Sequence, residues 1–87
     1  MSSNVLDYLE LSDEHSIMEL KAVDKIAGRT LVDLDVRAKY GVSIVGIKRG
    51  EEIMVSPDPN VPILLGDILI VIGADVDINR FIQKVIM

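Results

Sequence analysis

The sequence contains no cysteine and no tryptophan, and only 3% of its 87 residues are aromatic. Without cysteine, a disulfide framework, a cysteine-ligated metal site and a thiol nucleophile are all excluded. The longest apolar run, residues 68–72, is far shorter than a membrane-spanning helix requires, so no membrane insertion is expected. The chain also starts with polar residues, so no secretory signal is expected either.

Positive charge is scarce. The chain has 9 Lys and Arg residues against 14 Asp and Glu residues, which gives a formal net charge of −5. An acidic balance of this kind argues against binding to nucleic acid. Hydrophobic residues nevertheless make up 49% of the chain, which is too apolar for intrinsic disorder. The length corresponds to one small domain.

The residues that usually carry catalysis are also sparse. The single histidine, His15, has no positioned partner in sequence, and no metalloprotease, hydrolase, P-loop or dinucleotide-binding motif is present. Ser43 has no nearby general base. We therefore predict that the protein is not an enzyme and that it has no catalytic residues, no resident cofactor and no metal site. Turn or capping geometry explains several carboxylates better than acid–base chemistry does: Asp58, Asp67, Asp75 and Asp77.

Aliphatic residues are in excess. Ile, Leu, Val and Met account for 36 of the 87 residues, more than so small a domain can bury. Exposed apolar surface usually marks a contact with a partner, so a two-fold homodimer is favoured. A monomer with scattered surface aliphatics remains the alternative.

The periodicity of apolar residues predicts a small α+β domain in the order β-α-β-β-β-α. Strands are expected at residues 16–23, 42–47, 52–55 and 68–72, with a rigid proline loop at 56–62. Residues 1–15 fit either a short strand or the tail of a helix. Asp75 is expected to cap the last helix, whose apolar stripe consists of Ile78, Phe81, Ile82 and Val85.

The first helix is expected to run from the N-cap residue Thr30 to Tyr40 and to stop at Gly41. At 100° per residue it has two apolar sides. One side must cover the sheet, and the other is assigned to a partner subunit or a ligand, or else to loops of the same domain. The two sides consist of Leu31, Leu34 and Ala38, and of Val32, Val36 and Tyr40.

A basic stretch follows this helix. Residues 37–50 contain Arg37, Lys39, Lys48 and Arg49 and no acidic residue. Such a stretch can hold an anion, because arginine grips phosphate through two parallel hydrogen bonds. Taken alone, however, this basic stretch is better explained as the solvated end of a strand than as an anion site.

Three segments together resemble a known family: GRTLVDLDVRAKYG at residues 28–41, VSIVGIKR at 42–49 and LGDILIVIG at 65–73. They resemble the RCK-C (TrkA-C) domain of regulators of potassium conductance, from about residue 16 to residue 85. The leading residues 4–11 are similar to the start of this domain in Ktr-type potassium uptake regulators. The resemblance implies that residues 1–15 are a linker from a missing N-terminal Rossmann (RCK-N) domain, and that residues 16–87 are the ligand-binding domain.

The resemblance also implies a function. Such domains form two-fold homodimers that bind cyclic di-AMP between the subunits and lower potassium uptake. The protein is then expected to be cytoplasmic and peripheral to a membrane potassium transporter. Ser43 stands where many relatives have asparagine, which offers one more donor. By the family pattern, the ligand contacts are Leu31, Val32, Asp35, Val36 and Arg37 on the helix, Ser43 on the strand and Pro59 in the loop.

Two other functions remain open at this point. The domain could be a pure dimerisation module without a ligand of its own, or it could sense another effector, such as a cation held by acidic residues. A nucleotide sensor requires Arg37 and Ser43 to line an open cleft. In a pure dimerisation module these two residues can be covered.

Overall fold

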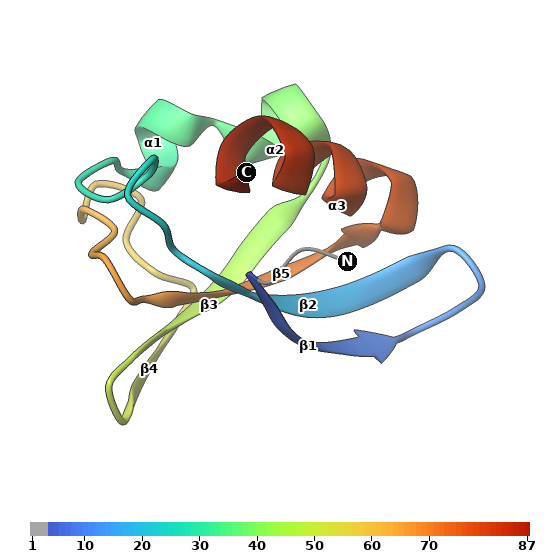
Figure 1. The fold of residues 1–87 in the computed structure, drawn as a ribbon, viewed down its shortest axis with the longest axis horizontal. Helices are drawn as coiled ribbons and strands as arrows, with labels where there is room; N and C mark the ends of the chain where they lie inside the picture. Colours follow the sequence, from blue (N-terminus) through green and yellow to red (C-terminus); the bar gives the residue numbers. More distant parts are fainter. Residues whose placement is uncertain (1–3) are drawn as a thin grey trace.

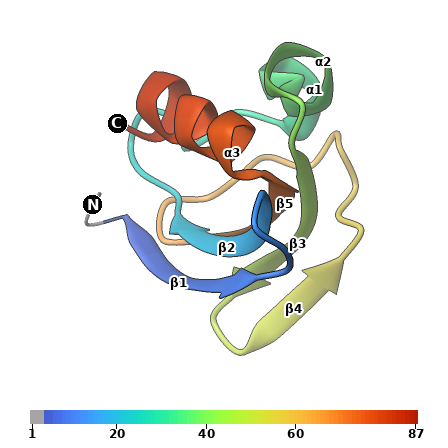
Figure 2. The same cartoon turned by 90° about the vertical axis from the view of Figure 1, so that its right-hand side faces the viewer.

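A computed structural model describes residues 4–87 as a five-stranded antiparallel sheet with helices on one face (Figures 1 and 2). The strands are ordered β1-β2-β5-β3-β4 across the sheet. The predicted α+β fold class is therefore confirmed. The elements are β1 (Val5–Glu10), β2 (His15–Lys21), α1 (Leu31–Leu34), α2 (Val36–Tyr40), β3 (Ser43–Arg49), β4 (Glu52–Val55), β5 (Ile68–Ala74), α3 (Asp75–Phe81) and the wide final turn η1 (Ile82–Ile86).

The leading segment contributes a strand. β1 pairs antiparallel with β2, with Val5 opposite Leu20 and Glu10 opposite Ser16. This resolves the choice that the sequence left open for residues 1–15, insofar as the structure describes them, and adds one strand to the predicted order. The segment expected to be a linker therefore lies in the same sheet as the domain that follows it.

The core lies between the sheet and the helices. In β2 the predicted alternation holds, because Leu20 is fully buried, as is Ala22 just beyond the strand. In the central strand β5, Leu69 and Val71 are fully buried, whereas the intervening Ile70 is only partly buried. Alternate residues of a strand point to opposite faces, so only one face of the sheet is sealed by the helical layer.

The predicted single helix at residues 30–40 is wrong in one respect, because the chain breaks it into α1 and α2 at Asp35. Thr30 does cap α1, accepting a hydrogen bond from the Asp33 amide at 3.1 Å, and Gly41 does end α2. Asp35, however, has φ 46° and ψ 47°, a left-handed conformation that cannot continue a right-handed helix.

The break also overturns the expected two apolar sides. Leu34 and Val36 are both buried although they belong to opposite sides of a continuous helix, and Ala38 is exposed. The left-handed residue between Leu34 and Val36 rotates the chain so that both side chains turn toward the core.

The last helix follows its predicted stripe, and all four of its predicted core residues are buried. The expected cap is wrong: Ala74 occupies the N-cap position, and Asp75 is the first helical residue. The Asp75 carboxylate instead accepts a hydrogen bond from the Ser16 hydroxyl at 2.7 Å. Of the helices described, none has the length and apolar character needed to span a bilayer.

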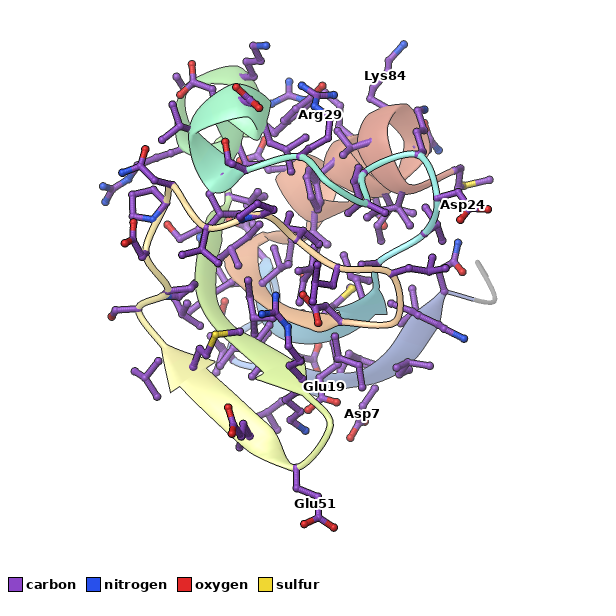
Figure 3. All side chains as sticks on the ribbon, turned by 90° about the vertical axis from the view of Figure 1, so that its left-hand side faces the viewer. Asp7, Glu19, Asp24, Arg29, Glu51 and Lys84 are labelled. Atoms are coloured by element: carbon purple, nitrogen blue, oxygen red, sulfur yellow. The ribbon has the colours of Figure 1, made fainter. Side chains whose placement is uncertain are left out.

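The outer face of the sheet carries no helix (Figures 1 and 2). Lys48 on β3 and Glu19 on β2 form an ion pair of 2.8 Å that crosses the central strand on this face. Figure 3 shows Glu19 beside Asp7, its cross-strand neighbour on β1, and Glu51 projecting from the tip of the β3–β4 hairpin. Charged side chains thus cover part of the face that the helices leave open.

Candidate functional site

A hollow of about 400 Å³ lies where the α1–α2 junction meets β3 and the start of the proline loop. It brings together five of the seven residues predicted to form the site: Leu31, Asp35, Val36, Arg37 and Ser43. These residues come from two short helices and a strand, so the chain must fold before they meet. The family pattern therefore selected residues that share one surface.

The hollow depends on the helix break. Because Asp35 is left-handed, Val36 turns into the core while Asp35 and Arg37 stay exposed on either side of it. Arg37 also anchors the end of α2, since its carbonyl accepts the Gly41 amide at 3.1 Å. A straight helix would place these residues on different sides, so the break positions the polar groups of the site.

Arg37 is the cation of the hollow. Within residues 4–87 its side chain has no hydrogen-bond or ion-pair partner. Lys48 and Arg49, by contrast, are paired with Glu19 and Asp67 at the other end of β3. The basic residues that are close in sequence therefore lie in two separate places in the structure. Those at the end of β3 are paired, whereas the Arg37 donors are available for an anion.

The other two predicted site residues, Val32 and Pro59, do not line the hollow. They lie next to each other, because the Val32 amide donates to the Pro59 carbonyl at 3.1 Å. Val32 is 56% exposed. This backbone bond holds the proline loop against α1 and gives the site an apolar margin outside the hollow.

Sequence reasoning missed half of the lining of the hollow. Ser56 has a left-handed φ of 48°, and its amide donates to the Val45 carbonyl at 3.0 Å, which turns the chain from β4 into the loop. The register of β3 also shifts between Ile44 and Gly46. No sequence signal marks either feature, since both depend on how β3 pairs with its neighbours. The missed residues are Val42, Ile44, Val45, Ser56 and Pro57.

The far end of the proline loop is fixed by an ion pair whose carboxylate is buried and whose guanidinium is partly exposed. Arg49 donates to both carboxylate oxygens of Asp67, at 2.9 and 2.7 Å, and to the Pro62 carbonyl at 3.2 Å. Asp67 is almost fully buried and also accepts the Leu64 amide. Burial raises the pKa of the Asp67 carboxyl, but the hydrogen bonds from Arg49 and Leu64 outweigh it, so the pKa lies below its ordinary value. Asp67 is thus a structural anchor rather than a ligand contact.

Across residues 4–87, no group of three or more histidine, cysteine, aspartate and glutamate side chains is placed to hold a metal ion. Among the described residues, the chemistry available in the hollow is the guanidinium of Arg37, the carboxylate of Asp35, the hydroxyls of Ser43 and Ser56, and several aliphatic side chains. This set suits an anionic ligand that also carries a flat apolar group.

Comparison with protein families gives a match to the TrkA-C domain over residues 16–85. The chain is 58% identical over 86 residues to Ktr system potassium uptake protein C of Bacillus subtilis, and 47% identical over 78 residues to Ktr system potassium uptake protein A of the same organism. These alignments cover 99% and 90% of the chain but only 39% and 35% of the relatives. The chain therefore spans at most about two fifths of the length of these relatives.

Solved structures share the fold. The RCK C domain of the potassium transport protein KtrA, in complex with cyclic di-AMP, matches with 57% identity and a TM-score of 0.80, over 85% of this chain and 87% of that one. The RCK_C domain dimer of Streptococcus agalactiae BusR, also in complex with cyclic di-AMP, matches with 25% identity and a TM-score of 0.66, over 75% and 88%. The GsuK channel bound to NAD matches with 27% identity and a TM-score of 0.74, over 83% of this chain and 14% of that one.

Proposed function

The chain belongs to the TrkA-C (RCK-C) domain family, and from that premise we propose that it senses cyclic di-AMP for a Ktr-type potassium uptake system. In this proposal two copies form a two-fold dimer, bind one cyclic di-AMP between them and thereby lower potassium transport. Two Ktr potassium uptake proteins among the relatives support the transport system, and the cyclic di-AMP complexes of two structural neighbours support the ligand.

One observation carries the proposal: the Arg37 guanidinium, which has no partner among residues 4–87, lies in a hollow with aliphatic walls. Arg37 can grip a phosphate through two parallel hydrogen bonds, while Leu31 and Val36 offer apolar surface to a base. A cyclic dinucleotide has two phosphates related by a two-fold axis. A two-fold dimer presents Arg37 twice, so each phosphate meets one guanidinium.

The remaining site residues fit the same ligand. Ser43 lines the hollow and offers a hydroxyl, which is a shorter and less versatile group than the asparagine amide of many relatives. Val32 and Pro59 lie outside the hollow, so we assign them to the parts of the ligand that extend beyond it. Asp35 adds a carboxylate that can accept a hydrogen bond from an amino or hydroxyl group.

The wider setting is part of the proposal. We infer that residues 1–15 follow an N-terminal Rossmann domain, and that the whole regulator acts in the cytoplasm on a membrane potassium transporter. This chain covers only 39% and 35% of the two Ktr relatives, so the rest of each relative is long enough to contain such a domain. Ligand binding would then shift the geometry of the dimer and pass that change to the other domain.

Isothermal titration of the chain with cyclic di-AMP tests the proposal, with cyclic di-GMP and AMP as controls. We expect binding of cyclic di-AMP alone, with one ligand per two chains. If a folded and dimeric chain binds none of the three, the sensor proposal is overturned and a pure dimerisation module takes its place. A thermal shift with calcium in the absence of nucleotide would favour a cation sensor instead.

A further inference from the structure

A second and larger recess lies at the opposite edge of the sheet. It has a volume of about 720 Å³ and runs between the inner face of β1 and the side of α3 and η1. Figure 2 shows why it exists: α3 lies above the sheet on the β1–β2 side, and β1 extends outward beneath it. We call this recess the β1 groove; the nucleotide site proposed above does not use it.

The β1 groove is amphipathic. Val5, Met18 and Ile82 line it from below and from the helix side. Asn79 and Gln83, which are four residues apart and so lie on one face of the helical segment, add two exposed amides. Amide side chains both donate and accept hydrogen bonds, so they suit the polar backbone of another polypeptide.

One end of the groove is acidic. Glu10 lies directly opposite Ser16 in the β1–β2 ladder, and the Ser16 hydroxyl donates to Asp75 at 2.7 Å. Ser16 therefore bonds to one carboxylate that lines the groove and lies opposite the residue that carries the other. Every ionisable group other than tyrosine in its lining is acidic, since Lys, Arg and His are absent from it among the described residues. This end is complementary to a cationic group.

β1 also has a free edge. It is the outermost strand, with β2 as its one neighbour among the described strands. Its side chains are unusually apolar for an exposed edge: Tyr8 is 58% and Leu9 61% exposed. The Tyr8 amide of this strand donates to the neighbouring Asp7 carboxylate at 2.8 Å, and a strand added at this edge would replace that bond. An exposed edge with apolar side chains is a template for an added strand.

We infer that β1 and the β1 groove dock an extended polypeptide segment that carries a basic residue. The segment adds a strand to the free edge of β1, and every second side chain points into the groove toward Gln83 and Tyr8. Its basic residue lies opposite Glu10 and Asp75. This surface is additional to the proposed nucleotide site and does not depend on it.

The charge of the β1 segment favours a basic polypeptide over a second copy of this chain. Residues 4–15 contain Asp7, Glu10, Asp13 and Glu14 and no lysine or arginine. Pairing β1 with β1 of another copy would place these carboxylates against each other, and like charges on opposed strands are destabilising. A partner of opposite charge avoids that repulsion.

Selection from a display library of random ten-residue peptides tests the inference, with the whole chain as bait. We expect enriched peptides to carry Arg or Lys at one end, followed by alternating apolar residues. Synthetic versions of these peptides should bind the Glu10→Lys variant about tenfold more weakly, because the charge at the acidic end is reversed. Glu52→Lys, on the other edge strand, is the matched control and should leave the affinity unchanged.

The location of binding is checked by hydrogen exchange. Peptide addition should slow exchange of β1 amides and leave β4 amides unchanged. Arg37→Ala should not alter peptide affinity, which separates this result from the fate of the nucleotide proposal. The same selection is repeated with the Glu10→Lys variant as bait. If no peptide is enriched on the original chain relative to this variant, the inference is overturned. Protection that appears on β4, or self-association of the chain through β1, also overturns it.

Discussion

The two edges of this sheet are built from similar parts and have opposite character. At the β3–β4 edge, two short helices broken at Asp35 leave a hollow of about 400 Å³ whose charged groups are the Arg37 guanidinium and the Asp35 carboxylate. At the β1 edge, the longer α3–η1 segment leaves a groove of about 720 Å³ whose charges are the carboxylates of Glu10 and Asp75. The first edge therefore offers a cation to an anionic ligand, whereas the described lining of the second contains acidic side chains and no basic one, within a chain of net charge −5.

The shape of the helical layer explains how so small a domain can have two candidate binding surfaces. The helical layer is too narrow to cover five strands, so it seals the middle of the sheet and leaves both margins partly open (Figure 2). The core residues of α3 supply much of the burial, including Ile78 and Phe81. Side chains at the margins contribute less to the core, so they are available for binding.

The largest effect is expected at the basic edge. Arg37→Ala should weaken cyclic di-AMP binding about a hundredfold, because one phosphate contact is lost in each half of the dimer. The melting temperature should stay the same, since the Arg37 side chain has no partner in the described part of the chain. Titration calorimetry and a thermal melt measure the two quantities.

Glu10→Lys is the control for that experiment, because it changes charge at the other edge. It should leave nucleotide affinity unchanged. An Arg37→Ala protein that binds cyclic di-AMP as tightly as the original, or a Glu10→Lys protein that loses it, would end the assignment of the nucleotide to the basic edge.

The next effect concerns the anchor of the proline loop. Asp67→Ala should lower the free energy of unfolding by about 2 kcal/mol, because it removes the acceptor of the Leu64 amide and the carboxylate that pairs with Arg49. Urea denaturation at neutral pH measures this loss. If the loss is negligible, backbone bonds such as Val32–Pro59 and Ser56–Val45 hold the loop beside the hollow without help from the ion pair.

The same anchor predicts a pH dependence. The pKa of Asp67 is lower in the folded chain than its ordinary value, so the folded state favours the carboxylate. Its stabilisation is fully present above about pH 4 and is lost as the pH falls through the folded pKa. The fall in stability below pH 4 should be shallower in Asp67→Ala. Equal slopes in both proteins would show that the pair does not control acid stability.

A smaller effect tests the helix break. Asp35→Ala should destabilise the domain by about 1 kcal/mol, because alanine resists the left-handed conformation at this position. Asp35→Gly should recover most of that loss, since glycine adopts a positive φ readily. An alanine variant more stable than the original would mean that α1 and α2 prefer to join, and that the hollow depends on Asp35 itself.

The smallest effect tests the acidic edge. Ser16→Ala should cost about 1 kcal/mol, because Ser16 is buried and its hydroxyl donates to Asp75. Ser43→Ala, in the hollow, is the matched control. Within residues 4–87 the Ser43 hydroxyl has no partner, so its loss should change stability little. Equal losses at both serines would contradict this contrast between the edges.

Local patterns in the sequence predicted most of the fold. The alternation in β2, the Thr30 cap, the Gly41 stop and the stripe of α3 each depend on neighbours a few residues apart. The break at Asp35 was not predictable in this way, because aspartate is compatible with a continuous helix. It exists because tertiary packing draws both Leu34 and Val36 into the core.

The candidate site was predictable only in part for the same reason. The family pattern supplied Leu31, Asp35 and Arg37, and the fold brings these residues to one hollow. The contributions of Val45, Ser56 and Pro57 arise from the pairing of β3 with its neighbours and from a left-handed turn at Ser56. Nothing in the sequence near those residues fixes that geometry, and their role as ligand contacts stays a prediction.

The order of the strands has a consequence for folding kinetics. β1 with β2, and β3 with β4, are hairpins that can form from neighbouring residues, but the two hairpins share no ladder with each other. β5 joins them by pairing with β2 on one side and β3 on the other, and it comes last of the strands in the chain. The sheet therefore stays in two pieces until residues 68–74 arrive, and closure requires contacts across about 50 residues, a separation that slows folding. During synthesis on the ribosome, neither the nucleotide hollow nor the β1 groove is supported by a complete core until this final strand emerges.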